Sequence, residues 1–224
     1  MQIWEISAKE LLKSGGPILI PIFICSIIAV AIILGKMIYF SNIKTDTHKL
    51  KKDIFNLLKN NKLKEAIRLC ESNPSPVAKI LKAGIAKFGD SRDEMKERIE
   101  DVSLFEIPKL EKRFTALATI AHITPLLGLL GTVTGMTGSF YTIEQRAATM
   151  HPVTPGDLAG NIGEALITTV AGLLVAIPTF VAYNYLVSRV NAFVLEMERA
   201  ATELINFSIH LSETNMATET LKKS

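Results

Sequence analysis

The stretch TALATIAHITPLLGLLGTVTGMTGSFYTI (residues 115–143) contains no charged side chain, and this feature decides the fold. A helix needs about 20 apolar residues, at about 1.5 Å each, to cross a hydrocarbon layer about 30 Å thick. The stretch is long enough for that purpose, and His122 is its one residue that titrates near neutral pH. We therefore expect a transmembrane helix here.

Two further runs have the same character. One is PILIPIFICSIIAVAIILG (17–35), and the other covers residues 165–188, with Glu164 at its outer edge. A cleavable signal peptide has a basic start and a short apolar core. The first sixteen residues instead carry two acids and two lysines, and the first run continues to Lys36. We therefore expect three retained spans.

Charge is distributed unevenly around these spans. Hydrophobic residues make up 48% of the chain and charged residues 21%, and 18 of the 25 Lys and Arg residues fall between Lys36 and Arg113. The same segment carries 12 acids, which argues against a nucleic-acid partner. Basic residues gather on the cytoplasmic side of membrane proteins. The pattern predicts a cytoplasmic segment after the first span, an N-terminus outside and a C-terminus inside.

The predicted protein is an all-α integral membrane protein with three transmembrane helices, two of them extended into a cytoplasmic helical domain. Its N-terminal segment, with Trp4 as an anchor, is expected to form an interfacial helix in contact with membrane lipid. The predicted segments are a periplasmic N-terminus (1–16), the first span (17–40), the cytoplasmic helical domain (41–114), the second span (115–141), a periplasmic loop (142–162), the third span (163–188) and a cytoplasmic C-terminal helix and tail (189–224).

The charged segment has helical periodicity and clear helix boundaries. Asn73-Pro74-Ser75-Pro76 predicts a turn, and residues 77–88 predict a helix that ends at Gly89. Ser91 and Glu94 have the spacing of a capping box, which predicts that another helix begins there. Pro108 is expected to kink this helix. With Pro178 excepted, nothing in the sequence interrupts a helix over residues 158–211.

Small and hydroxyl-bearing residues gather on one side of the second and third spans. Helices in lipid associate through close approach at such residues, so these two spans should pack tightly, on each other or on neighbouring subunits. The first span is bulkier and suits a lipid-facing position. The residues on these sides are Pro125, Gly128, Gly131, Thr132, Gly135, Gly138 and Ser139 in the second span, and Ala165, Thr168, Thr169, Gly172, Ala176 and Thr179 in the third.

Thr132 and Thr169 are predicted to lie at similar depths, about 13 Å and about 9 Å from the outer ends of their spans at about 1.5 Å per residue. An oligomer would arrange these hydroxyls as a polar ring. The alternative is that each hydroxyl binds a carbonyl of its own helix. Glu164 should face a cavity or a partner, or else interact with the positive helix start, a role for which Asp157 competes. His122 is interpreted as a packing histidine, with a proton carrier as the alternative.

No pattern in the sequence points to enzymatic chemistry. Gly128-Leu-Leu-Gly131 lacks the strand and phosphate context of a nucleotide-binding loop. Cys25 and Cys70 are predicted in different environments, so neither a disulfide nor a metal site is expected. We predict no catalytic residue, no metal and no cofactor.

The runs ATIAHITPLLGLLGTVTGM (118–136) and IGEALITTVAGLLVAIPTFVAYN (162–184) closely resemble the ExbB/TolQ/MotA proton-channel family. The order of one span, a large cytoplasmic segment and two spans resembles the ExbB and TolQ members. The resemblance implies pore threonines at Thr132 and Thr169, the family's glutamate at Glu164 and a helix-kinking proline at Pro125. His122 departs from the family pattern, which usually has small or hydroxyl residues there.

Further residues are expected either to line the pore or to pack the helices. Those with either role are His122, Ser139 and Thr168. Those expected at kinks and helix contacts are Pro125, Gly128, Gly131, Gly135, Gly172 and Pro178.

The resemblance implies a homopentamer in a bacterial inner membrane around a dimer of a single-span ExbD- or TolR-like partner. With that partner, the chain would convert the proton motive force into work on envelope proteins, such as the energising of outer-membrane transport, through a TonB- or TolA-like protein. Two alternatives remain open: an oligomeric scaffold without ion conduction, and a sodium-coupled motor.

Overall fold

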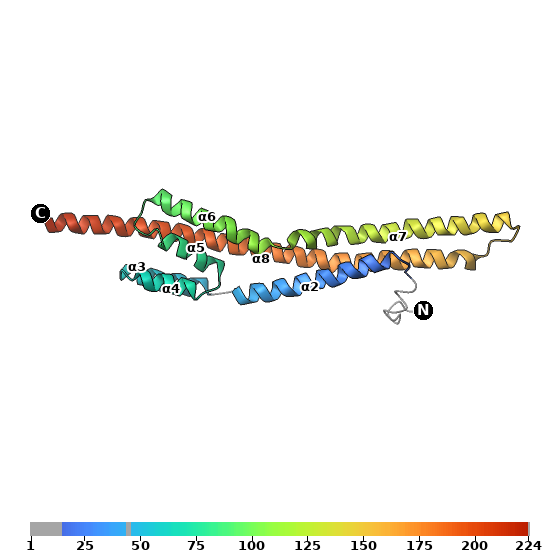
Figure 1. Cartoon of the computed structure of the whole chain (residues 1–224), viewed down its shortest axis with the longest axis horizontal. Coiled ribbons are helices and arrows are strands. Elements are labelled where there is room, and N and C mark those ends of the chain that lie inside the picture. The colour runs from blue at the N-terminus through green and yellow to red at the C-terminus, as the bar shows by residue number, and fades with distance from the viewer. Residues whose placement is uncertain (1–14, 44–45, 224) are drawn as a thin grey trace. The chain divides into compact units, whose positions relative to one another are not determined.

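The computed structural model describes residues 15–43 and 46–223, and within these ranges every regular element is an α-helix. The predicted all-α class is confirmed. The expected interfacial helix around Trp4 lies outside the described residues. The helices are α2 (Leu19–Ile43), α3 (Thr47–Lys59), α4 (Leu63–Glu71), α5 (Pro76–Ile85), α6 (Arg92–Glu111), α7 (Phe114–Ala148) and α8 (Pro155–Lys223) (Figure 1).

Three helical stretches are long and apolar enough to cross a membrane. They contain α2, α7 and the first part of α8. Many of their large apolar side chains are exposed, among them Phe23, Leu126 and Leu174. Exposed apolar side chains are suited to lipid, and the chain is therefore an integral membrane protein, as the sequence predicts.

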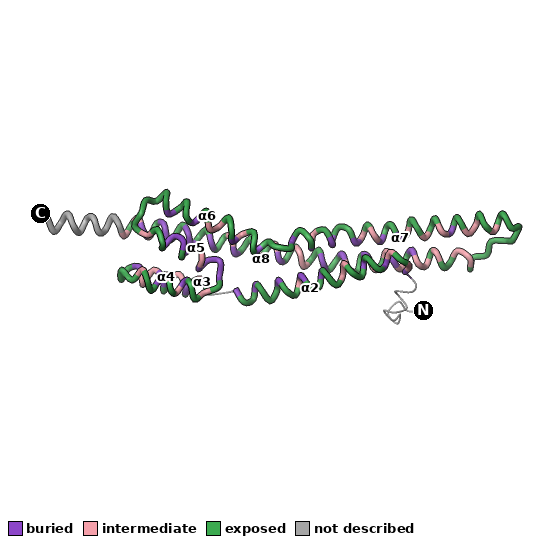
Figure 2. Tube along the Cα trace, in the orientation of Figure 1, coloured by how far each residue is buried: buried purple, intermediate pink, exposed green. Residues whose placement is uncertain are grey.

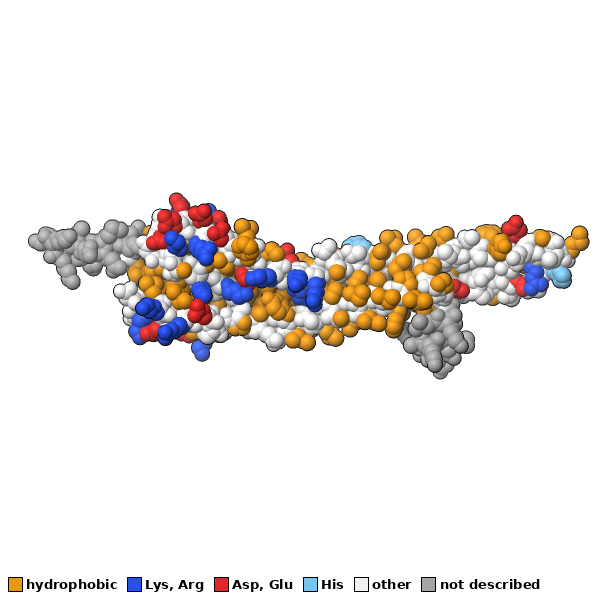
Figure 3. Space-filling view, viewed as in Figure 1, with side chains coloured by type: hydrophobic (Ala, Val, Ile, Leu, Met, Phe, Trp, Pro, Cys, Tyr) orange, Lys and Arg blue, Asp and Glu red, His pale blue; other side chains and the backbone are white. Residues whose placement is uncertain are grey.

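The chain forms two compact units, which we call the membrane unit (Met1–Gly35 and Arg113–Tyr185) and the charged unit (Lys36–Lys112 and Leu186–Ser224). Hydrophobic side chains cover the visible helices of the membrane unit, whereas most of the Lys, Arg, Asp and Glu side chains in view lie over the charged unit (Figure 3). Each unit has its own buried residues.

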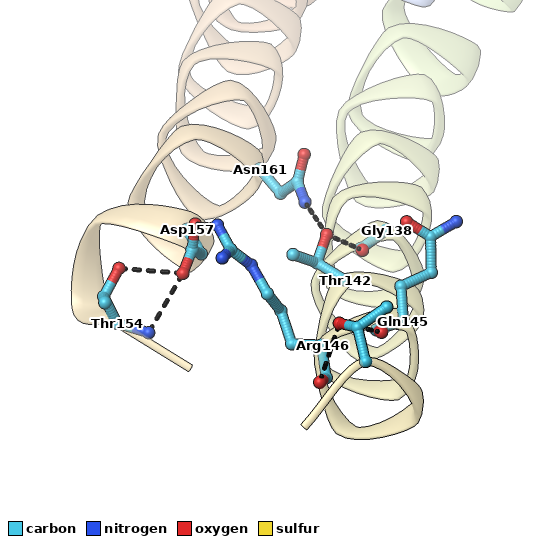
Figure 4. Close-up of polar contacts among 8 residues, drawn as sticks. Gly138, Thr142, Gln145, Arg146, Thr154, Asp157 and Asn161 are labelled. Carbon is cyan, nitrogen blue, oxygen red and sulfur yellow. Dashed lines mark hydrogen bonds and ion pairs between the residues drawn. The ribbon is translucent and has the colours of Figure 1, made fainter. Parts of the chain in front are cut away.

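In the membrane unit, α7 and α8 are joined by a short connection. The sequence predicts a loop over residues 142–162, but α7 continues to Ala148 and α8 already begins at Pro155. An ion pair between Arg146 and Asp157 joins the two helix ends (Figure 4). One carboxylate oxygen of Asp157 also accepts hydrogen bonds from the Thr154 backbone N–H (3.0 Å) and hydroxyl (2.8 Å). Both helices thus continue beyond the apolar runs, and these contacts lie at their ends.

The charged unit packs α3 to α6 around the later part of α8. Its core contains Ile54 of α3, Ile80 and Leu81 of α5, Met95 of α6 and Leu204 of α8, each at most 1% exposed. Buried residues are concentrated on α5 (Figure 2). The core thus forms where the apolar faces of these helices meet.

Side-chain caps begin three of these helices. Asp46, Ser75 and Ser91 each accept a hydrogen bond from the backbone N–H three residues later. The helix predicted to end at Gly89 ends earlier, at Ile85, and a turn leads to Gly89, whose φ is +97°. Helix α8 is continuous from Pro155 to Lys223 and includes Pro178, the one residue at which the sequence allows an interruption.

Candidate functional site

The face of α7 that carries small residues packs directly on α8. A Cβ atom added to Gly131 would lie 2.6 Å from the Cβ of Thr168, and one added to Gly172 would lie 2.5 Å from the Thr124 carbonyl oxygen. At Gly128 the added atom would lie 3.0 Å from the Thr169 Cα. Glycine therefore allows the two backbones to approach more closely than any other residue would.

This contact continues toward the connection between α7 and α8. A Cβ on Gly135 would lie 2.6 Å from the Asn161 carbonyl oxygen and 2.7 Å from the Ala165 Cβ. The Asn161 amide also donates a hydrogen bond to the Thr142 hydroxyl at 3.5 Å (Figure 4). Close glycine packing thus gives way to polar contacts near the connection.

The Thr169 hydroxyl donates across the helix pair to the Gly128 carbonyl at 2.9 Å, and it also lies 3.2 Å from the Ala165 carbonyl. Thr132, one turn after Gly128, donates to the Leu129 carbonyl of its own helix at 2.7 Å. Both threonines are half-buried. A hydroxyl that donates still has lone pairs with which to accept a hydrogen bond. The hydroxyls of Thr132 and Thr169 can therefore each accept a hydrogen bond from another group.

Thr168 and Ser139 lie inside the membrane unit. The Thr168 hydroxyl is in reach of the Glu164 carbonyl at 2.8 Å and the Gly15 carbonyl at 3.0 Å, and the residue is 1% exposed. Ser139 is also buried and donates to the Gly135 carbonyl at 3.2 Å. In this structure both side chains therefore make packing contacts within one chain.

Glu164 faces the segment that leads into α2. Its Oε1 atom lies 1.6 Å from the position that a Cβ on Gly16 would occupy, and the φ of Gly16 is +62°. Because Leu19 begins α2 three residues later, the carboxylate is near the positive end of that helix. Glu164 and Thr168 of α8 therefore contact the residues that lead into α2. The sequence could not reveal this contact, because residues 16 and 164 are far apart along the chain.

His122 lies on the exposed face of α7. Its Nδ1 is 2.7 Å from the Ala118 carbonyl oxygen, and its ring meets the Phe180 ring edge-on with centroids 6.2 Å apart. Thr115 and Thr119 are exposed on the same face. The sequence analysis did not single out these two threonines, although steps of four residues from Thr115 to Thr119 and of three from Thr119 to His122 place all three on one helix face.

Pro125 in α7 and Pro178 in α8 lie in the interior of spanning helices, whereas Pro21 lies in the first turn of α2. Each of the two interior prolines removes the N–H that would bind the carbonyl four residues earlier. Both helices continue through their prolines. Among the described residues no group of three or more His, Cys, Asp or Glu side chains could hold a metal ion.

Comparison with known proteins identifies the family. The family model described as the MotA/TolQ/ExbB proton channel family matches residues 72–199. This chain belongs to the MotA/TolQ/ExbB proton channel family. The matched region contains α7 and the part of α8 that packs against it. Membership places the chain in a family of proton-channel proteins.

Several members of the family are similar over much of the chain. A protein named putative biopolymer transport protein ExbB-like 3, from Synechocystis sp., is 31% identical over 171 residues, which cover 76% of this chain and 80% of that protein. Biopolymer transport protein ExbB of Neisseria meningitidis is 29% identical over 199 residues, covering 81% and 87%. Tol-Pal system protein TolQ of Haemophilus influenzae is 38% identical over 130 residues, covering 58% and 50%.

Proposed function

We propose that the chain is the pore-forming subunit of a proton-driven motor in a bacterial inner membrane. Five copies surround a dimer of a single-span ExbD- or TolR-like partner, with the N-terminus in the periplasm and the C-terminus in the cytoplasm. Proton flow through this complex does mechanical work on envelope proteins through a TonB- or TolA-like protein. Family membership supports this proposal, together with the Thr132 and Thr169 hydroxyls described above.

The position of Thr169 is the observation that carries the proposal. Its hydroxyl donates to the Gly128 carbonyl, one turn before Thr132, so both hydroxyls lie near one level of the helix pair. An acid in an apolar environment favours its neutral form. A protonated acid on the partner can donate its O–H to these hydroxyls, whereas release of its proton needs water or another polar group nearby. In our proposal Thr132, Thr169 and Glu164 supply those groups in the pore.

The test replaces Thr132 and Thr169 by valine, separately and together, in the chain purified with its partner. Valine keeps the shape of threonine and removes the hydroxyl. The matched controls are Thr134→Val and Thr137→Val, whose hydroxyls donate to carbonyls of the same helix. We expect proton flux into liposomes to fall at least tenfold in Thr132→Val and Thr169→Val and to stay near wild type in the controls, with subunit number unchanged in native mass spectrometry.

Other outcomes would distinguish the alternatives. If the wild-type complex carries no ion under a membrane potential, the chain is a scaffold. If flux requires sodium and does not follow the proton gradient, the motor is sodium-coupled. Flux that survives loss of both hydroxyls would contradict the assigned pore.

The orientation has its own test. Met150, between α7 and α8, is 96% exposed, and Lys52 is exposed on α3 of the charged unit. We expect a membrane-impermeant maleimide to label Met150→Cys from the periplasm of intact spheroplasts and Lys52→Cys only after lysis. The reverse pattern would overturn the proposed topology.

A further inference from the structure

Helix α6 presents two apolar features on its outer surface. The first is a ridge formed by Leu104 and Phe105, which are 72% and 71% exposed. Both side chains lie in the charged unit, where Asp101 and Pro108 beside them are exposed as well. Apolar side chains so exposed in a charged part of a protein mark an interaction surface.

The second feature is a groove of about 340 Å³ between α6 and α8 within the charged unit. Ile99 and Ile107 of α6 and Met197, Ala201 and Ile205 of α8 supply its apolar surface. The groove is partly open to the surface, so a neighbouring helix can place side chains in it.

The ridge and the groove face in different directions. At about 100° per residue, the α6 residues of the groove and the pair Leu104 and Phe105 are about 140° apart around the helix axis. The ridge and the groove therefore face largely different directions, and two different neighbours can occupy them.

Charge along α6 favours a second copy of this chain as the occupant. Glu94, Glu97 and Asp101 lie on the same side of α6 as the ridge, and Figure 3 shows acidic side chains gathered over one end of this helix. Four charged residues line the groove, with Arg92 and Lys96 toward that same end and Glu100 and Glu198 farther along it. Parallel helices in register would bring Glu94 and Glu97 to Arg92 and Lys96, and Leu104 and Phe105 to the apolar part of the groove near Ile107.

Copies inserted in one membrane with the same topology are parallel, which is the orientation that this match requires. A contact between two different surfaces is heterologous, and repetition by rotation closes it into a ring. We infer that the Leu104–Phe105 ridge of each subunit occupies the α6–α8 groove of the next, and that this contact joins the cytoplasmic parts of the ring. The inference rests on the proposed oligomeric function and names an interface for it.

Cysteine pairs test the contact. Phe105→Cys is combined with Glu198→Cys, which lines the groove together with Ser103 and Ile107, and the full-length protein is treated in membranes with a short bismaleimide. We expect a ladder of covalent oligomers. Each single variant and the wild type, with Cys25 and Cys70, should give no ladder. The register control pairs Phe105→Cys with Asn206→Cys, which lines the groove about 12 Å from position 198 along α8, at about 1.5 Å per residue. This pair should react at least fivefold less than the pair with Glu198→Cys.

The remaining outcomes overturn the inference in distinguishable ways. Dimers from Phe105→Cys alone would mean that two ridges meet. A product with the mass of this chain plus its partner would assign the ridge to the partner. If native mass spectrometry shows a ring but the pair does not react, this interface is wrong and the proposed function stands. A monomer in that measurement would contradict both.

Discussion

The Glu164 carboxylate occupies the space that a side chain on Gly16 would need, with Oε1 1.6 Å from the Cβ position. Gly16 also has a φ of +62°, in the left-handed region that costs other residues about 1–2 kcal/mol. The neighbouring Gly15 carbonyl is 3.0 Å from the Thr168 hydroxyl. Gly15 and Gly16, which precede α2, therefore lie against Thr168 and Glu164 of α8.

We expect Gly16→Ala to destabilise the protein by about 1 kcal/mol through its backbone and to displace the Glu164 carboxylate. Gly35→Ala is the matched control, because its Cβ would meet nothing within 4 Å. Denaturation in mixed micelles, followed by circular dichroism, measures both. A double-mutant cycle with Glu164→Gln tests the coupling, and additive effects would show that the two positions are independent.

Glycines along α8 should respond to alanine with opposite signs. At Gly172 the new Cβ would lie 2.5 Å from the Thr124 carbonyl, a backbone atom that moves only if α7 and α8 separate. We expect a loss of about 1–3 kcal/mol, as for overpacked cores. At Gly163 nothing lies within 4 Å, and alanine should stabilise the helix by about 0.5–1 kcal/mol. The same denaturation assay checks both, and equal effects would contradict the close helix contact.

The sequence predicts elements better than it predicts contacts between them. Uncharged runs predict the three spanning helices because hydrocarbon excludes charge, and Ser91 predicts the start of α6 because its hydroxyl caps the first turn locally. Helix α7 ends at Ala148 and α8 begins at Pro155, so their connection is shorter than the predicted loop of residues 142–162. Sequence patterns do not reveal the ion pair of Arg146 with Asp157 at the two helix ends.

Side-chain direction was harder still to predict. The small-residue faces indicated that α7 and α8 should pack closely, but they left the partner open between each other and a neighbouring subunit. The contact of Glu164 with Gly16 depends on where α2 packs in the membrane unit, and no periodic pattern in the sequence predicts that position. The predicted pore role of Glu164 stays a prediction.

Lys36 is buried in the charged unit, with 7% exposed, and donates to the Leu110 carbonyl at 2.6 Å and the Lys109 carbonyl at 3.4 Å. These carbonyls end α6, where a cation is favourable. We expect Lys36→Met to cost about 1.5–3 kcal/mol, the range for a hydrogen bond to a charged group. The exposed control Lys52→Met should change stability by less than about 0.5 kcal/mol. Faster hydrogen exchange near the end of α6 should accompany the loss, and unchanged exchange would contradict this role.

Cys70 should be inert to thiol reagents in the folded protein. It is 2% exposed, and burial, partly offset by the charge of Lys82, raises the pKa of its thiol to about 11. Little thiolate is therefore present at pH 8, and the sulfur is shielded as well. In a Cys25→Ala background we expect labelling by a maleimide to follow unfolding of the charged unit. Rapid labelling without denaturant would show that α4 opens locally.

Glu106 should give the charged unit a stability that depends on acid pH. Burial alone would raise the pKa of this carboxyl, but hydrogen bonds from Lys109 and Lys79, both at 2.6 Å, and their charges outweigh burial and hold the pKa below its usual value. The pKa of Glu106 is lower in the folded protein than in the unfolded chain, where it is about 4.3, so the ionised carboxylate stabilises the fold. This stabilisation is complete above the pKa of the unfolded chain. It is lost as the pH falls through the pKa of the folded protein.

The measurement compares wild type with Glu106→Gln in denaturant titrations between about pH 7 and about pH 3, a window that brackets the unfolded pKa. We expect Glu106→Gln to be less stable at neutral pH and the difference to shrink as the solution is acidified, because the wild-type carboxylate then takes up a proton. Glu111→Gln, at an exposed position on the same helix and outside the inferred subunit contact, is the control and should stay within about 0.5 kcal/mol of wild type. A Glu106→Gln difference that stays constant down to the lowest pH would mean that the two lysines do not stabilise the charged form of Glu106.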